Sequence, residues 1–228
     1  MNASIKTYGA AAASGALLAL SFPAWHLWPV MAVSLVPLFA SALSLGPRAC
    51  FARFFTSGCL FFLILLHWLL ANVYWAGGWA ILGYFLLSAF LALYWGVLGL
   101  LWAWMRERLW WLPLSLTTAL LWAAMEHLQG RLLTGLGWGS LGYAQGKNLY
   151  FVQLASLGGV SLISAVVVAF NVLLAQAVVH RKRRLLRLAC AGTVLVGPHV
   201  LGWQLIDEPE REGRLLKVAL VQSNFPQE

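Results

Sequence analysis

One stretch of this sequence combines ionisable side chains with an irregular, glycine-rich backbone. It covers residues 121–145, where Glu126 is the only acidic residue set within an apolar span and is followed by His127 and Arg131. The glycines are spaced too irregularly for an ordinary helix, at Gly130, Gly135, Gly137, Gly139 and Gly142. In a membrane, ionisable side chains are costly, and non-helical backbone is tolerated only where protein or trapped water satisfies it. We therefore interpret this stretch as a candidate functional site.

Two specialised kinds of site are not indicated by this stretch. Gly137, Gly139 and Gly142 satisfy the pattern G-x-G-x-x-G, but that pattern marks a dinucleotide site only between a strand and a helix. Here it lies between apolar runs, so we expect the glycines to permit positive φ or close backbone approach in a tight loop. His127 neighbours Glu126 but lies about 100° around the helix, which favours an interfacial histidine over a metal ligand. We expect neither a metal nor a cofactor.

The composition is that of an integral membrane protein. Of 228 residues, 61% are hydrophobic and only 10% are charged, whereas a soluble domain carries about 25% charged residues. The net charge of +8 does not indicate nucleic-acid binding, because the basic residues lie in connections between apolar runs, where membrane topology accounts for them. Disulfides and a thiolate metal site are also not expected, since no paired spacing relates Cys50, Cys59 and Cys190.

Seven apolar runs predict membrane-spanning helices. The first follows Lys6 and is interpreted as a retained span rather than a signal peptide, because six further runs follow it. The runs cover about residues 8–22, 27–43, 54–71, 80–105, 112–128, 151–179 and 185–204. The expected fold is therefore an all-α polytopic membrane protein, a seven-helix bundle over residues 1–206.

The basic residues are distributed unequally between the two sets of connections. The set on the opposite side from the N-terminus contains only Arg131 and Lys147. The set on the N-terminal side contains ten, namely Lys6, Arg48, Arg53, Arg106, Arg108, Arg181, Lys182, Arg183, Arg184 and Arg187. Because basic connections stay in the cytoplasm, we predict a cytoplasmic N-terminus. With seven spans the C-terminus and the 121–145 stretch then face outward.

The composition changes after residue 206. A charged linker over residues 207–214 precedes LLKVALVQ at 215–222, a β-rich run that predicts one mostly buried strand. A lone strand has no partners, and even a two-stranded hairpin is marginal in water. We therefore expect residues 215–228 to begin a truncated second domain, and the sequence does not distinguish a fragment from a split or decayed gene.

Three segments relate this sequence to a known family. They are FPAWHLWP at residues 22–29, TGLGWGSLGYAQ at 134–145 and VALVQSNFPQ at 218–227. The second is similar to the pattern T-G-[FL]-x-W-x-x-x-G-Y-[ST]-Q, with Ala144 where Ser is usual, and the third is similar to the opening strand of a nitrilase-type domain. In their order and spacing they resemble the bacterial apolipoprotein N-acyltransferase family over essentially the whole chain.

The resemblance implies an enzyme of the bacterial inner membrane whose α/β nitrilase-type (CN hydrolase) domain lies in the periplasm. Such enzymes take an acyl chain from a phospholipid onto a cysteine as a thioester. They then pass it to the α-amino group of the diacylglyceryl-cysteine of an apolipoprotein. The implied partners are thus a phospholipid donor, a diacylated apolipoprotein acceptor and membrane lipids. The family's catalytic Glu, Lys and Cys lie beyond Glu228, so no catalytic residue is carried over and we expect this chain alone to be inactive.

The resemblance gives the ionisable residues of the stretch three alternative roles. Glu126 can form a structural ion pair or hydrogen bond that ties the outer loop to the bundle. Alternatively, Glu126 or Arg131 lines the cleft where lipid head groups meet the catalytic domain, or takes part in acid–base chemistry. Trp138, Tyr143 and Gln145 are expected to point from the loop toward the interface or that domain. These five residues are the candidate lining of the substrate cleft.

Two other classes of function are compatible with parts of this pattern. A non-catalytic membrane anchor or subunit for a separate nitrilase-type domain fits the apolar runs and the strand equally well. A small-solute transporter is disfavoured, because no internal repeat is visible and a strand follows the linker.

Overall fold

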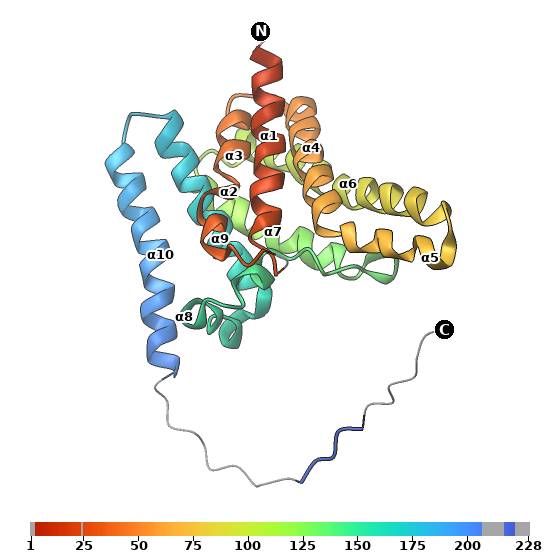
Figure 1. Ribbon diagram of the computed structural model, residues 1–228. Coiled ribbons are helices and arrows are strands. Elements are labelled where there is room, and N and C mark those ends of the chain that lie inside the picture. The colour runs from red at the N-terminus through yellow and green to blue at the C-terminus, as the bar shows by residue number, and fades with distance from the viewer. Residues whose placement is uncertain (1–2, 24, 207–216, 222–228) are drawn as a thin grey trace.

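The computed structural model describes residues 3–23, 25–206 and 217–221, with the backbone alone for residues 3–7 and 134. Helices account for nearly all of it (Figure 1). In chain order they are α1 Ala3–Leu20, η1 Trp28–Val30, α2 Met31–Ser34, α3 Val36–Ala42, α4 Pro47–Leu65, η2 His67–Asn72, α5 Val73–Ala76, α6 Trp79–Arg108, α7 Leu114–Gln129, η3 Leu132–Thr134, η4 Leu141–Gln145, α8 Leu149–Val152, α9 Ala155–Val179 and α10 Arg184–Ile206.

The long helices form a bundle with α1 near its middle (Figure 1). α1 packs against α3 and α4, α4 packs along α6, and α7 pairs with α9. α10 stands at one edge of the bundle and packs chiefly against α9 and α8. Its buried residues are Ala191 and Gly202 alone among those described. Most of α10 therefore faces the surroundings, and its apolar composition suits a lipid environment.

The membrane prediction is confirmed, whereas the count of seven spans is not. Among the described residues, four helices are long and apolar enough to cross a membrane, namely α4, α6, α9 and α10. The first two expected spans correspond to shorter apolar helices over Tyr8–Leu20 and Trp28–Ala42, and the fifth is α7, of 16 residues. The protein is thus a multi-pass membrane protein in which several passes are short or interrupted.

The second apolar segment is interrupted between α2 and α3, near Pro37. In a continuous helix the amide of Leu35 would donate to the carbonyl of Met31. Instead, the buried amide side chain of Asn171 joins both groups: Leu35 N donates to its Oδ1 at 3.0 Å, and its Nδ2 donates to Met31 O at 3.0 Å. Likewise, Oγ of Ser14 in α1 accepts a hydrogen bond from the backbone N–H of Leu38 in α3 at 2.8 Å. Side chains of α9 and α1 thus satisfy a backbone that lipid cannot.

A buried aromatic cluster joins α3, α4, α6 and α7. The ring of Phe39 lies 5.8 Å from that of Trp102 and 6.4 Å from that of Trp122, which in turn lies 4.9 Å from Trp95. Trp102 also donates from Nε1 to Thr118 Oγ1 at 2.8 Å. Aromatic pairs in these edge-to-face and tilted arrangements add to the stability gained by burial. The cluster fixes the position of α7, and with it the residues at the end of that helix.

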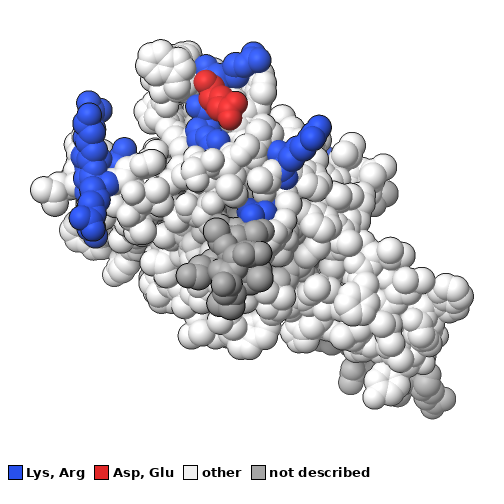
Figure 2. All heavy atoms as spheres, turned by 90° about the horizontal axis from the view of Figure 1, so that it is seen from above, with Lys and Arg blue, Asp and Glu red and all other residues white. Residues whose placement is uncertain are grey.

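Basic residues gather at one end of the bundle. Figure 2 looks onto the end where α1 begins and shows Lys and Arg spread over it. The start of α4, the end of α6 and the α9–α10 connection all lie at this end. One of these side chains, Arg53, is buried and stacks its guanidinium over the Tyr8 ring at 3.7 Å. This end of the bundle therefore presents positive charge.

The predicted strand after the linker is not confirmed. Lys217–Val221 have no regular secondary structure. The rest of the predicted strand, the charged linker and the end of the chain lie outside the described residues. The proposed division into domains therefore stays a prediction.

Replacing Asn171 is expected to destabilise the bundle. In Asn171→Leu the amide of Leu35 and the carbonyl of Met31 both lose a buried partner, at a cost of roughly 2 kcal/mol or more in the free energy of unfolding. Gln153→Leu is the matched control, because Gln153 donates only to a carbonyl of its own turn, Leu149 O. Unfolding followed by circular dichroism in mixed micelles measures both. Equal stability of the two variants would contradict this role of Asn171.

Candidate outer site

Glu126 lies on the last turn of α7 and is held by two hydrogen bonds. Its Oε1 accepts from Trp122 Nε1 at 3.0 Å and from the backbone N–H of Leu141 at 2.8 Å. Trp122 belongs to the aromatic cluster, while Leu141 begins η4 in the glycine-rich segment. Leu141 and Trp122 are both buried, so without Glu126 these two donors would lack an acceptor, and a buried polar group without a partner is costly. The carboxylate therefore fastens the outer loop to the bundle.

An ion pair of Glu126, one of the two forms expected for its structural role, is not found among the described residues. Arg131 is exposed, and the one ion pair they contain joins Arg106 and Glu107 at the other end of the bundle. The second oxygen of Glu126, Oε2, is buried and has no hydrogen-bond partner among the described groups. Ser164 of α9 lies beside this carboxylate. Of the alternatives weighed from the sequence, the structure contains the hydrogen bond that ties the loop to the bundle.

Other side chains fasten the same loop. Ser164 Oγ accepts from the backbone N–H of Gly142 at 2.9 Å, directly after the amide that Glu126 binds. Gln129 pairs with Leu136 twice, since Leu136 N donates to Gln129 O at 3.0 Å and Gln129 Nε2 donates to Leu136 O at 3.2 Å. Each contact satisfies a backbone N–H or C=O group that has no partner within a helix, so side chains of the bundle hold the loop in a defined conformation.

At two positions the glycines have the roles expected from the sequence, namely a positive φ or a close approach of the backbone. Gly135 has a φ of +71°, in the left-handed region that favours glycine. At Gly142 a Cβ would lie 2.6 Å from Val160 O, so only glycine permits this approach to α9. Gly137 has neither property. The G-x-G-x-x-G pattern therefore reflects loop geometry, as expected for a pattern outside a βαβ unit.

Trp138 and Tyr143 lie at the surface and border two hollows. The first, of about 400 Å³, is lined by Phe22, Pro23, Leu65, Leu66, Trp68, Trp138 and Tyr143. The second, of about 80 Å³, is lined by Ser21, Pro23, His26, Trp28, Tyr143, Ala144, Gly146 and Lys147. Trp138 is 56% exposed and Tyr143 51% exposed, and the Trp138 ring lies 5.3 Å from that of Trp68. One hollow is thus apolar and aromatic, and its neighbour holds the polar groups.

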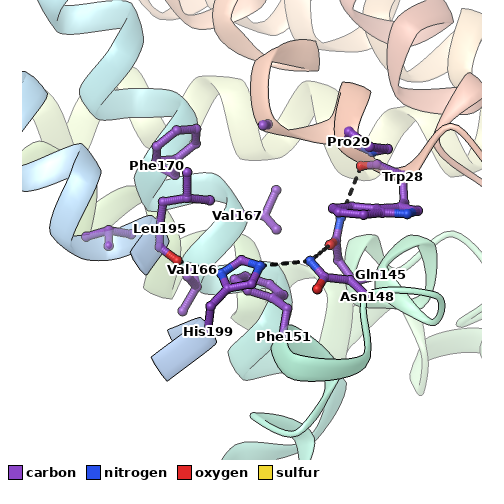
Figure 3. Close-up of a pocket in the computed structure, with 12 residues that line it drawn as sticks. Trp28, Pro29, Gln145, Asn148, Phe151, Val166, Val167, Phe170, Leu195 and His199 are labelled. Atoms are coloured by element: carbon purple, nitrogen blue, oxygen red, sulfur yellow. Dashed lines mark hydrogen bonds between the residues drawn. The ribbon is translucent and has the colours of Figure 1, made fainter. Parts of the chain in front are cut away.

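Gln145 does not point outward, and that expectation is wrong. Its side chain is 5% exposed; Nε2 donates to Trp28 O at 3.3 Å, and Oε1 accepts from Asn148 Nδ2 at 3.1 Å. Asn148 Nδ2 also lies 3.1 Å from His199 Nε2 of α10 (Figure 3). This chain of polar groups borders a small cavity of about 50 Å³ between α9 and α10. Gln145 turns inward because the carbonyl of Trp28 and the amide of Asn148 both need partners there.

None of the cysteines lines these hollows. Cys50 is buried with its Sγ near Leu45 O at 3.4 Å, Cys59 is half-buried in α4, and Cys190 is exposed on α10. Glu126 lines neither outer hollow. The described residues contain no group of three or more His, Cys, Asp or Glu arranged to hold a metal ion. The lining of these two hollows therefore consists of apolar, aromatic and a few polar side chains, without a thiol.

Several residues of the outer face were not singled out from the sequence. Ser164, Gln129, Asn148 and His199 all contact the loop or the small cavity next to it. A usable signal was present, because single polar residues within apolar helices tend to hydrogen-bond across helix interfaces. The sequence alone does not determine which backbone group without a helical hydrogen bond each of these side chains contacts.

Comparison with known proteins supports a family assignment. The sequence model described as the apolipoprotein N-acyltransferase N-terminal domain matches residues 14–173. This range includes α7, the glycine-rich loop and most of α9, and it ends before α10. A search of curated proteins gives no match.

Substitutions of Glu126 test the attachment of the loop. In Glu126→Ala, the amide of Leu141 and the indole of Trp122 lose their acceptor, so we expect tryptic cleavage after the exposed Arg131 to be at least about five-fold faster, the change for a loss of roughly 1 kcal/mol. Glu126→Gln keeps an oxygen acceptor and is expected to be cleaved at nearly the original rate. Glu107→Ala, which removes an exposed carboxylate, is the control. Unchanged cleavage of Glu126→Ala would contradict the attachment.

Proposed function

Because the chain belongs to the apolipoprotein N-acyltransferase family, we propose that its outer face holds the lipid substrates of acyl transfer. The donor is a phospholipid, and the acceptor is the diacylglyceryl-cysteine at the N-terminus of an apolipoprotein. In this reaction a nucleophilic cysteine of a nitrilase-type domain attacks an ester carbonyl of the donor, which forms a thioester, breaks the ester bond and releases a lysophospholipid. The α-amino group of the acceptor then attacks the thioester carbonyl, which forms the amide and releases the thiol.

The observation that carries this proposal is the pair of hollows that meet at Tyr143. Hydrocarbon chains gain about 25 cal/mol for each Å² of apolar surface removed from water, and the larger hollow offers them aromatic and leucine side chains. Lys147 and His26, in the smaller hollow, supply polar groups for the phosphate or ester end of a lipid. A ligand with an apolar chain and a polar head fits this pair of adjacent hollows, one apolar and one polar.

The membrane domain contributes positioning to the proposed reaction. Its rigid loop, fastened by Glu126, Ser164 and Gln129, holds Trp138 and Tyr143 at fixed places beside the apolar hollow. Fixing reactants near one another lowers the entropic part of an activation barrier. No cysteine of this chain reaches the hollows, so the nucleophile is assigned to the nitrilase-type domain.

The orientation proposed for the chain follows from its charges. We assign it to the bacterial inner membrane, with seven passes, a cytoplasmic N-terminus and a periplasmic C-terminus. The unequal distribution of basic residues supports this. The exposed tryptophans Trp25, Trp68, Trp75, Trp79 and Trp138 fit a membrane–water interface at the outer boundary, where the proposed topology places them. Tryptophan is enriched at membrane–water interfaces. The outer hollows then open at the periplasmic surface.

Photo-crosslinking tests the proposed substrate site. A phospholipid carrying a diazirine near the end of one acyl chain is reconstituted with the protein, irradiated, and its attachment sites are found by peptide mass spectrometry. We expect labelling within residues 62–68 and 138–143 that a diacylated lipopeptide competes away. Trp138→Ala and Tyr143→Ala should each lower this labelling about ten-fold or more, since burial of a large apolar side chain contributes roughly 1.5–3 kcal/mol.

Trp111→Ala is the control for this experiment, because Trp111 is also exposed, at 65%, but lies on the connection between α6 and α7 at the other end of the bundle. It should leave the labelling unchanged. Equal labelling along the lipid-facing side of α6, with no competition by the lipopeptide, would contradict the proposal.

Reporter fusions test the orientation. A reporter that is active only in the periplasm should work when fused after Trp75, Gly139 or Gly213, because the proposed topology places these positions outside. The same reporter should be silent after Pro47, Glu107 or Arg183, where flanking basic residues hold the connection in the cytoplasm. The reverse pattern would overturn both the orientation and the location of the substrate site.

A further inference from the structure

A wide groove opens at the basic end of the bundle, far from the outer hollows. Its volume is about 590 Å³, within the range of about 300–1,000 Å³ typical of small-molecule sites. It lies between the end of α6, the start of α7, the end of α9 and the start of α10. The lining residues are Leu43, Arg106, Leu109, Trp110, Leu112, Pro113, Leu114, Ser115, Leu173, Gln176, His180, Arg183, Leu186, Arg187 and Cys190.

The packing of α10 explains why this groove exists. α10 packs chiefly against α9 and α8, so at the basic end α9 forms the floor while α7 and α10 form the two walls. The connection from α6 to α7 closes one side and carries Trp110, which is 81% exposed. The groove is therefore a consequence of how the helices pack rather than of one mobile side chain.

Two of the three arginines in the lining are held in place by backbone carbonyls. Arg106 donates to Ala42 O at 3.0 Å and to Leu45 O at 2.7 Å, and its one acidic neighbour is the exposed Glu107, at 3.8 Å. Arg187 donates from Nη1 to His180 O at 3.0 Å and to Lys182 O at 2.7 Å. A guanidinium has five N–H donors, so both keep donors for a ligand while their positions stay fixed.

The third arginine, Arg183, is the one whose side chain makes no hydrogen bond or ion pair to the described residues. It lies in the connection between α9 and α10 with a φ of +58°, a conformation that costs a non-glycine residue of order 1 kcal/mol. The lining contains no Asp or Glu. The groove thus presents three guanidinium groups and His180 without an acidic residue of its own to balance them.

The apolar part of the lining distinguishes between possible anions. Six leucines of the lining share the groove with the arginines, namely Leu43, Leu109, Leu112, Leu114, Leu173 and Leu186. A soluble phosphate would gain nothing from them, whereas a lipid places its phosphate beside its own hydrocarbon chains. An exposed tryptophan at the rim, such as Trp110, is typical of a membrane interface.

We propose that this groove binds the phosphate group of an anionic phospholipid, with Arg106, Arg183 and Arg187 around the phosphate and the leucines along the first part of the acyl chains. Guanidinium groups suit phosphate because their planar donors bind two oxygens at once. In the proposed orientation this lipid belongs to the cytoplasmic leaflet. The site would hold α10 in place against α7 and α9, and it is independent of the substrate site at the outer face.

Lipid titration of the purified chain tests the proposal. Native mass spectrometry in detergent counts the lipids bound as phosphatidylglycerol or phosphatidylcholine is added. We expect one phosphatidylglycerol to bind in preference to phosphatidylcholine. Arg183→Gln should weaken its apparent affinity about five-fold, the change expected when one basic side chain near an anionic lipid is lost. Arg183→Lys keeps the charge and should recover most of the affinity.

Arg181→Gln is the matched control. Arg181 carries the same charge as Arg183 and is two residues away in the sequence, but it does not line the groove. It should leave the affinity nearly unchanged. An equal loss in Arg181→Gln and Arg183→Gln would overturn the proposal in favour of diffuse attraction by the whole basic connection. Competition by inorganic phosphate or glycerol phosphate at concentrations similar to the lipid would overturn it as well, since a free phosphate would then be the ligand. Neither result would affect the crosslinking at the outer face.

Discussion

Lipid cannot hydrogen-bond a peptide group, so the open backbone groups at a helix interruption need partners from elsewhere in the protein or from trapped water. Asn171 of α9 joins the amide and carbonyl left open between α2 and α3. Glu126 of α7 and Ser164 of α9 accept from successive amides at the start of η4. These polar contacts permit irregular backbone within an apolar bundle, and the irregular backbone in turn forms the outer face.

The two ends of the bundle offer different chemistry to lipids. At the outer end, Trp68, Trp138 and Tyr143 border an apolar hollow beside a smaller one that contains Lys147. At the other end, arginines from three helix termini or connections surround a groove with leucine walls. Aromatic side chains accept many acyl chains with little selectivity, whereas fixed guanidinium groups select for an anionic head. The proposed substrate site and the proposed anionic-lipid site would each use the kind of surface that its own end of the bundle provides.

Local features of the sequence were sufficient for the membrane class of the protein and for the place of its irregular, glycine-rich segment. The fraction of charged residues excludes a soluble domain, and apolar runs as long as those of α6 and α9 predict spans from length alone. The glycine spacing after Gly130 predicts a non-helical segment. Glu126 stands out because an acidic side chain within an apolar run is costly and therefore needs a partner. Each of these inferences depends only on neighbours along the chain.

Which partner each polar residue meets was decided by the tertiary structure. Arg131 is close to Glu126 in the sequence, yet the carboxylate binds the amide of Leu141, 15 residues away. Gln145 belongs to a surface loop, yet it turns inward because the carbonyl of Trp28, 117 residues away, faces it. Sequence spacing determines the face of a helix on which a residue lies, but only the packing of one helix against another determines which open backbone group lies opposite. Sequence therefore determined the membrane class and the irregular outer loop, while packing alone decided the contacts that hold the loop and the groove beside α10.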